Sequence, residues 1–119
     1  MKQPQLTTPS DISLHEPLRR TLPNGVTIHT LCAAEFEVVR VSFGAGSAQQ
    51  RKAFVATSTA NLLSEGTRDM TAHQIAEQLD YYGSWYDVNV DRDYVYISFC
   101  SLSKYFRQTL AVAEQILLH

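Results

Sequence analysis

The spacing of apolar residues changes along the chain, and these changes limit the folds that it can adopt. Alternation with a period of two is typical of half-buried strands, whereas recurrence at every third or fourth residue is typical of helices. In order, the chain reads as two strands, two helices, two strands and a helix, over residues 18–31, 38–43, 50–65, 71–83, 84–90, 93–100 and 103–119. The order β-β-α-α-β-β-α predicts an α+β fold, in which helices pack on one face of a largely antiparallel sheet.

Local signals support several of these boundaries. Asn24-Gly25 predicts a tight turn within the first segment, and the polar residues Asp91 to Asp93 predict a turn that joins an antiparallel pair. Thr71 and Gln74 have the spacing of a helix capping box. Gly66 and Gly83 are placed to end the two central helices.

The periodicity also predicts which side of each helix is buried. The expected buried stripes are Val55, Thr59 and Leu62 in the first helix, Ile75, Leu79 and Tyr82 in the second, and Phe106, Leu110, Ala113 and Leu117 in the third. The third helix reaches His119 without a capping signal, so we expect it to belong to a larger fold.

Composition excludes several classes of protein. The 119 residues suffice for one domain; they are 45% hydrophobic and 18% charged, as in ordinary globular proteins. A net charge of −2 argues against nucleic acid as a partner, and no apolar run has the roughly 20 residues of a membrane span. We interpret residues 1–17 as a polar leader or linker and 18–119 as part of one domain. The compartment is open, since a bacterial cytoplasm and a periplasm both fit.

Isolated motifs for chemistry are weak. Cys32 and Cys100 have no metal or redox spacing, so buried free thiols are favoured over a disulfide. His73 and Glu77 share a helix face but have no visible third ligand, so a solvated pair is favoured over a metal site. The stretch "FGAGSAQQ" lacks a third glycine and a Lys-Ser/Thr pair, so a glycine-containing strand end is favoured over a phosphate loop.

Two aromatic groups lie at the ends of predicted elements. They are Tyr81, Tyr82, Trp85 and Tyr86, and Lys104, Tyr105, Phe106 and Arg107. Without an excess of positive charge, packing in the core and at its rim explains them better than stacking on nucleic acid.

The strand "GSWYDVNV" has one apolar and one polar face, which is typical of a strand near a sheet edge. The free backbone groups of such a strand can pair with an extended peptide. A half-exposed strand without any ligand explains the pattern as well.

The stretch "ATSTANLLSEGT", residues 56–67, carries a short polar face on a predicted helix. Thr57, Asn61 and Ser64 recur there at helical spacing. Such a face is a site, a contact surface or the remnant of a site, and these residues alone do not distinguish the three.

Several segments together resemble the insulinase/pitrilysin family of zinc metallopeptidases, which includes mitochondrial processing peptidases. They are, in order, "LPNGVTIHTL", "VVRVSFGAGSAQQ", "NLLSEGT" and "GSWYDVNVDRDYVYISFCSL". Each is weak alone, but their order and spacing match the family from Leu18 to His119. The resemblance implies the N-terminal half of a metallopeptidase-like domain.

The family's inverted zinc motif, H-x-x-E-H, falls on the polar face. Counting back from Gly66-Thr67, the histidine positions are Thr57 and Asn61, and the glutamate position is Ala60. In the family, histidines at i and i+4 hold zinc and the glutamate acts as general base. Here all three side chains are replaced, and the third ligand of the family would lie beyond His119. We therefore expect no metal or catalytic residue on this chain, and no peptide hydrolysis by the family mechanism.

The resemblance further implies a role beside a catalytic partner. Active family members pair two related halves or subunits around a chamber, and only one of them carries zinc. We therefore interpret the chain as an inactive homologue that forms chamber wall or substrate-contact surface. Its edge strand, Ser84, Trp85, Tyr86, Asp87 and Val88, corresponds to the region that adds a substrate peptide in active members. The alternatives are a structural or assembly protein without a peptidase partner and, with least support, a peptidase that uses other residues.

Overall fold

A short hairpin lies in the first part of the chain. In a computed structural model, residues 14–32, 35–46 and 54–119 are described, and the chain divides into two units, Met1–Glu35 and Phe36–His119. The predicted boundary after residue 17 is not tested by this division and stays a prediction.

The hairpin of the first unit pairs β1 (Leu18–Thr21) with β2 (Thr27–Thr30) in antiparallel register. Gly25 has φ 85°, in the left-handed region that glycine tolerates, so the predicted Asn24-Gly25 turn is confirmed. This turn reverses the chain inside a segment whose pattern predicted a single strand. The segment therefore forms two strands.

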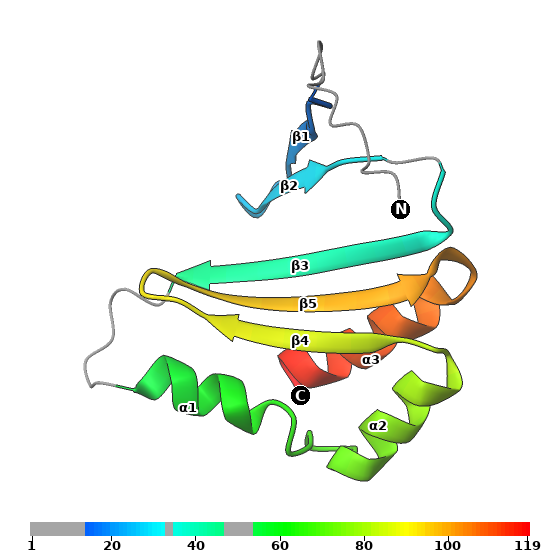
Figure 1. The fold of residues 1–119 in the computed structure, drawn as a ribbon. Coiled ribbons are helices and arrows are strands. Elements are labelled where there is room, and N and C mark those ends of the chain that lie inside the picture. Colours follow the sequence, from blue (N-terminus) through cyan, green and yellow to red (C-terminus); the bar gives the residue numbers. More distant parts are fainter. Residues whose placement is uncertain (1–13, 33–34, 47–53) are drawn as a thin grey trace, which may run out of the picture. The chain divides into compact units, whose positions relative to one another are not determined.

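A three-stranded antiparallel sheet forms the centre of the second unit, in the order β3-β5-β4. Its strands are β3 (Val38–Gly46), β4 (Trp85–Val90) and β5 (Tyr94–Leu102), and its helices are α1 (Val55–Leu62), α2 (Ala72–Tyr81), the 3-10 turn η1 (Ser103–Tyr105) and α3 (Phe106–Leu118). Figure 1 shows β5 between the two other strands. The predicted α+β class and the central position of the last strand are confirmed.

Strand β3 is longer than predicted and includes two glycines. Gly44 and Gly46 pair with Tyr96 and Tyr94 of β5, so the ordered strand continues into "FGAG". A Cβ atom on Gly44 would lie 3.1 Å from the Tyr96 ring, so the glycine leaves room for that ring. The remainder of the stretch weighed as a phosphate loop, from residue 47, lies outside the described residues.

The core lies between one face of the sheet and the helices α2 and α3. Ile97 and Phe99 of β5 pack with Ile75 and Leu79 of α2 and with a group on α3, namely Val112, Ala113 and Ile116. The Phe99 ring stacks on Tyr86 at 5.5 Å between ring centroids. Because residues alternate along β5, Ser98 and Cys100 lie on the opposite face.

Helix α2 agrees closely with its prediction. The Thr71 hydroxyl accepts a hydrogen bond from the Gln74 N–H, and the Gln74 side chain accepts one from the Thr71 N–H. This reciprocal capping box fixes the start of the helix. Ile75 and Leu79 are buried and Tyr82 is half-buried, and Gly83, with φ 60°, follows the helix as its terminating residue.

The buried side of helix α3 differs from the side that its sequence predicted. The buried residues are Thr109, Val112, Ala113 and Ile116, whereas Leu110 is 39% exposed. The reason is a buried cluster of hydroxyl groups. Thr109 Oγ1 lies 2.6 Å from Ser84 Oγ and 3.0 Å from Ser101 Oγ, so its polar group is satisfied and the helix turns this residue inward.

Candidate functional site

Helix α1 carries the positions at which the family resemblance puts a zinc motif. It packs against the edge strand β4, and Ala60 is its one buried residue, at 3% exposure. Thr57, Asn61 and Ser64 are exposed, as expected for a polar face. The glutamate position is thus closed in, while the two histidine positions on either side of it face solvent.

The buried side of α1 differs from the predicted stripe. Val55 and Leu62 are 48% and 65% exposed, whereas Ala56, Ala60 and Leu63 lie toward the protein. The helix thus turns two alanines toward the protein, and Leu63 packs against the core.

The end of α1 also differs from its prediction. The helix ends at Leu62 and a turn follows, so Gly66 comes four residues after the last helical residue and does not terminate it directly. Gly66 has φ 131°, and a Cβ there would lie 3.0 Å from the Met70 carbonyl oxygen. The glycine is therefore required by the loop after the helix.

The residues present do not fit zinc. A hydroxyl and an amide are poor ligands for this ion compared with His, Cys or carboxylate side chains, and Ala60 offers no ligand or base. Among the described residues, no three His, Cys, Asp or Glu side chains gather in an arrangement that could hold a metal ion. No hydrolytic step follows from this helix.

A tyrosine of β4 lies against the end of α1. The Tyr86 phenol lies close enough to Ser64 and Glu65 for both to influence its pKa. Burial raises the pKa of the Tyr86 phenol above its ordinary value of 10.0; the nearby Glu65 charge adds to the rise and the Ser64 hydrogen bond opposes it. Tyr86 is therefore a neutral hydrogen-bonding group at neutral pH.

Strand β4 lies at an edge of the three-stranded sheet, and the alternation predicted for it is confirmed. Tyr86, Val88 and Val90 are half-buried on the helix side, while Trp85 and Asp87 are exposed on the other. Ser84, immediately before the strand, is only 5% exposed, and its hydroxyl forms a hydrogen bond with the hydroxyl of Thr109. The assignment of Ser84 to Val88 as a substrate-contact strand stays a prediction.

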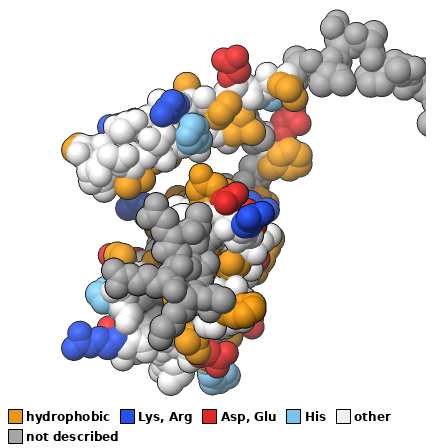
Figure 2. Space-filling model, turned by 90° about the vertical axis from the view of Figure 1, so that its left-hand side faces the viewer, with side chains coloured by type: hydrophobic (Ala, Val, Ile, Leu, Met, Phe, Trp, Pro, Cys, Tyr) orange, Lys and Arg blue, Asp and Glu red, His pale blue; other side chains and the backbone are white. Residues whose placement is uncertain are grey.

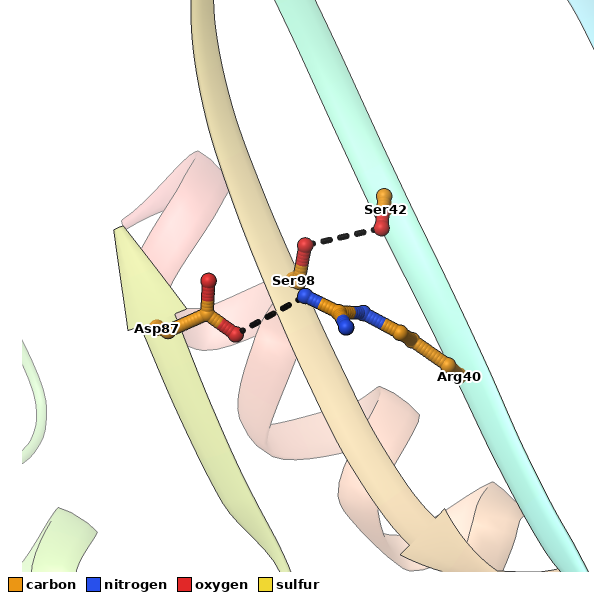
Figure 3. A network of polar contacts seen from close by, with 4 residues as sticks. All are labelled: Arg40, Ser42, Asp87 and Ser98. Atoms are coloured by element: carbon orange, nitrogen blue, oxygen red, sulfur yellow. Dashed lines mark hydrogen bonds and ion pairs between the residues drawn. The ribbon is translucent and has the colours of Figure 1, made fainter. Parts of the chain in front are cut away.

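A polar network crosses the sheet on the face away from the core. One oxygen of Asp87 on β4 contacts a guanidinium nitrogen of Arg40 on β3 at 3.2 Å, across β5 (Figure 3). Beside it, the hydroxyls of Ser42 and Ser98 lie 2.8 Å apart. Both charged side chains are half-exposed, so the ion pair contributes little to the stability of the fold. Another charged group from solution can therefore replace either partner.

The other candidates from the sequence separate into distinct places. His73 and Glu77 are exposed on α2. The two aromatic groups meet through Tyr82 and Tyr105, with ring centroids 5.4 Å apart, while Trp85 points to the opposite face of the sheet from Tyr86. Rim packing therefore accounts for the contact between the two groups.

The two cysteines behave differently. Cys100 is a buried free thiol on β5, as predicted, but Cys32 is also free and is exposed, after the end of β2. The expectation of burial for Cys32 was wrong because the segment 31–32 does not continue the strand.

Exposed apolar side chains occur around α1 and on the outer face of the sheet. They include Phe54, Leu62 and Trp85. Figure 2 shows apolar side chains scattered over the drawn face, with individual charged side chains between them. Within the part of the chain that the structure describes, no helix is both long and apolar enough to cross a membrane.

The fold is similar to that of a solved crystal structure. The chain matches the crystal structure of a peptidase M16 inactive domain from Pseudomonas fluorescens with a TM-score of 0.74 and 24% sequence identity. The match covers 86% of this chain but only 26% of that chain, so the residues described here span a minor part of its length. This likeness establishes the fold.

Comparisons at the level of sequence add no further relative. No model of a protein family matches the chain, and a search of curated proteins finds no match.

Proposed function

We propose that this chain is part of a non-catalytic member of the insulinase/pitrilysin-like zinc metallopeptidases. Its role is to form chamber wall or substrate-contact surface beside a related catalytic subunit or domain that holds the zinc. The observation that carries this proposal is a family framework around Thr57, Ala60 and Asn61, three residues that cannot perform the zinc chemistry of H-x-x-E-H.

Three structural observations support the proposal. The fold resembles that of an M16 domain described as inactive, and the helix with the degenerate motif packs against the edge strand β4. In addition, Ala60, at the position of the family's general base, is buried. These features fit a domain that has kept its architecture without its metal.

The partner is tested by co-purification of the full-length protein from its native cells. The expected result is a stoichiometric complex with a related protein that has an intact H-x-x-E-H motif, whose peptide hydrolysis falls when this chain is removed. A complex with no peptidase, or a partner whose activity does not depend on this chain, would support the alternative of a structural or assembly protein.

Metal content tests the non-catalytic part separately. Full-length protein purified without chelators or a metal-affinity tag is expected to contain no stoichiometric zinc. About one zinc ion per chain would mean that other residues form a zinc site in place of the lost ligands. That result would overturn the proposal.

A further inference from the structure

The free edge of β4 presents a defined set of backbone groups. The Asp91 N–H donates to the Tyr94 carbonyl at 2.9 Å, at the end of the β4–β5 register. In an antiparallel pair of strands, every second residue forms backbone hydrogen bonds with the partner strand. Counting back in steps of two from Asp91, the backbone N–H and C=O groups of Asp87 and Trp85 therefore point to β5 as well. The N–H and C=O groups of Tyr86 and Val88 therefore point to the free edge, where no described strand pairs with them.

Two exposed side chains of contrasting chemistry share the outer face of this strand. Trp85 is 55% exposed, and the side chain of Asp87 is 50% exposed. Arg40 contacts Asp87 through one oxygen alone, and the other carboxylate oxygen points away from the guanidinium in Figure 3. The half-exposed carboxylate can therefore accept a second cation, on the same face of the strand as the exposed indole ring of Trp85.

The charges around the strand favour a cationic occupant. Glu65 lies close enough to Tyr86 to influence its pKa. Asp91 and Asp93 lie in the turn after the strand, together with the basic residue Arg92. Arg40 reaches from β3 across β5, and its guanidinium contacts Asp87 at 3.2 Å, so the basic residues Arg40 and Arg92 face four acidic residues, Glu65, Asp87, Asp91 and Asp93. Within the described residues, the neighbourhood of the free edge is therefore acidic, which attracts basic and repels acidic peptides.

We propose that the edge of β4 selects extended peptides with a lysine or arginine opposite Asp87. The inference rests on the proposed role as substrate-contact surface and specifies its ligand. A peptide paired antiparallel to β4 bonds to Tyr86 and Val88, so the residue opposite Asp87 occupies a non-hydrogen-bonded position. The two Cα atoms there lie about 4.5 Å apart, the closest spacing in a ladder. A basic side chain then reaches the free oxygen of Asp87 and the face of Trp85.

The test uses the full-length protein and synthetic peptides of alternating threonine and valine with lysine, alanine or glutamate at the centre. Trp85 is the only tryptophan among residues 1–119, so a change in fluorescence that is lost in the Trp85→Phe variant reports binding at this strand. The lysine peptide is expected to bind about twofold to fivefold more tightly than the alanine peptide, and the glutamate peptide more weakly than either.

Three variants separate the roles of the charges. Asp87→Asn is expected to remove the preference for lysine, whereas Glu77→Gln, which removes an exposed carboxylate on α2, is expected to preserve it. Arg40→Gln removes the competing cation and is expected to increase the preference. Thermal melting of each variant controls for loss of the fold.

The backbone contribution has its own control. A lysine peptide with N-methyl groups on the residues that face β4 cannot donate the ladder hydrogen bonds and is expected not to bind. Equal affinity for the three peptides, or a lysine preference that survives Asp87→Asn, overturns the selectivity while leaving peptide pairing intact. If no peptide binds, pairing at β4 is overturned, and the catalytic partner is still tested independently by co-purification.

Discussion

Replacing Ala60 by glutamate would reintroduce the family's general base where the structure has closed the space for it. Ala60 is 3% exposed on the side of α1 that packs against β4. A larger side chain there costs about 1–3 kcal/mol through overpacking, and burial of an unpaired carboxylate adds about 1–3 kcal/mol more. We therefore expect Ala60→Glu to destabilise the fold by about 2–6 kcal/mol at neutral pH.

This expectation is checked by thermal and urea unfolding, with Ala60→Gln as a control of nearly equal shape. Burial raises the folded-state pKa of the introduced carboxyl above its unfolded value. The charge penalty is therefore absent below the unfolded pKa of about 4.3 and grows as pH rises toward the folded pKa. The glutamate and glutamine variants should have equal stability in acid and diverge near neutrality.

Two results would refute the reasoning about Ala60. One is a glutamate variant that melts within about 2 °C of the parent at neutral pH, since even 1 kcal/mol shifts a domain of this size by more. The other is a glutamate–glutamine difference that does not change with pH. By contrast, Thr57→His and Asn61→His alter exposed positions and should each change stability by less than about 0.5 kcal/mol.

The same structure yields three further predictions. Phe99→Ala should destabilise the fold by about 3–5 kcal/mol in urea unfolding, because the ring is 1% exposed at the centre of the core; a loss below 1 kcal/mol would contradict this. Thr109→Val should cost about 1–3 kcal/mol by leaving the buried hydroxyls of Ser84 and Ser101 without their shared partner, and a neutral effect in the same assay would exclude that role. The raised pKa of Tyr86 means that the folded state holds this proton more tightly, so stability should fall as pH rises from about 10, and Tyr86→Phe should remove that part of the decline in unfolding measurements.

The secondary structure could be predicted where short-range chemistry determines it. The capping box at Thr71 and Gln74 and the alternation over 85–90 both follow from local hydrogen bonding and from the period of the strand. The division of "LRRTLPNGVTIHT" into two strands was missed because its alternation continues on both sides of the turn.

The orientation of two helices could not be predicted in this way. Thr109 is buried because Ser84 and Ser101, distant in sequence, supply its partners, and no pattern within the helix reveals them. Helix α1 likewise exposes Val55 and Leu62 and turns two alanines toward the protein. In both helices, contacts from other elements outweighed the apolar period.

The edge position of β4 could be predicted from the sequence, but the surroundings of the candidate site could not. The assignment of the zinc-motif positions to Thr57, Ala60 and Asn61 follows from the family resemblance and stays a prediction. Burial of Ala60 and the open oxygen of Asp87 depend on the packing of α1 and on the distance to Arg40 across the sheet. Such distances are properties of the tertiary structure alone.

The central place of β5 in the sheet has a consequence for synthesis of the chain. β4 and β5 are joined by a short turn and can pair within microseconds of being made, whereas the nearest partners in β3 and β5, Gly46 and Tyr94, are about 50 residues apart. At ribosomal rates of about 5–20 residues per second, roughly 2–10 s pass between the synthesis of β3 and that of its partner strand β5. During that interval Val39, Val41 and Phe43 have no native strand to pair with, so β3 is the strand of this sheet that stays unpaired longest after its synthesis.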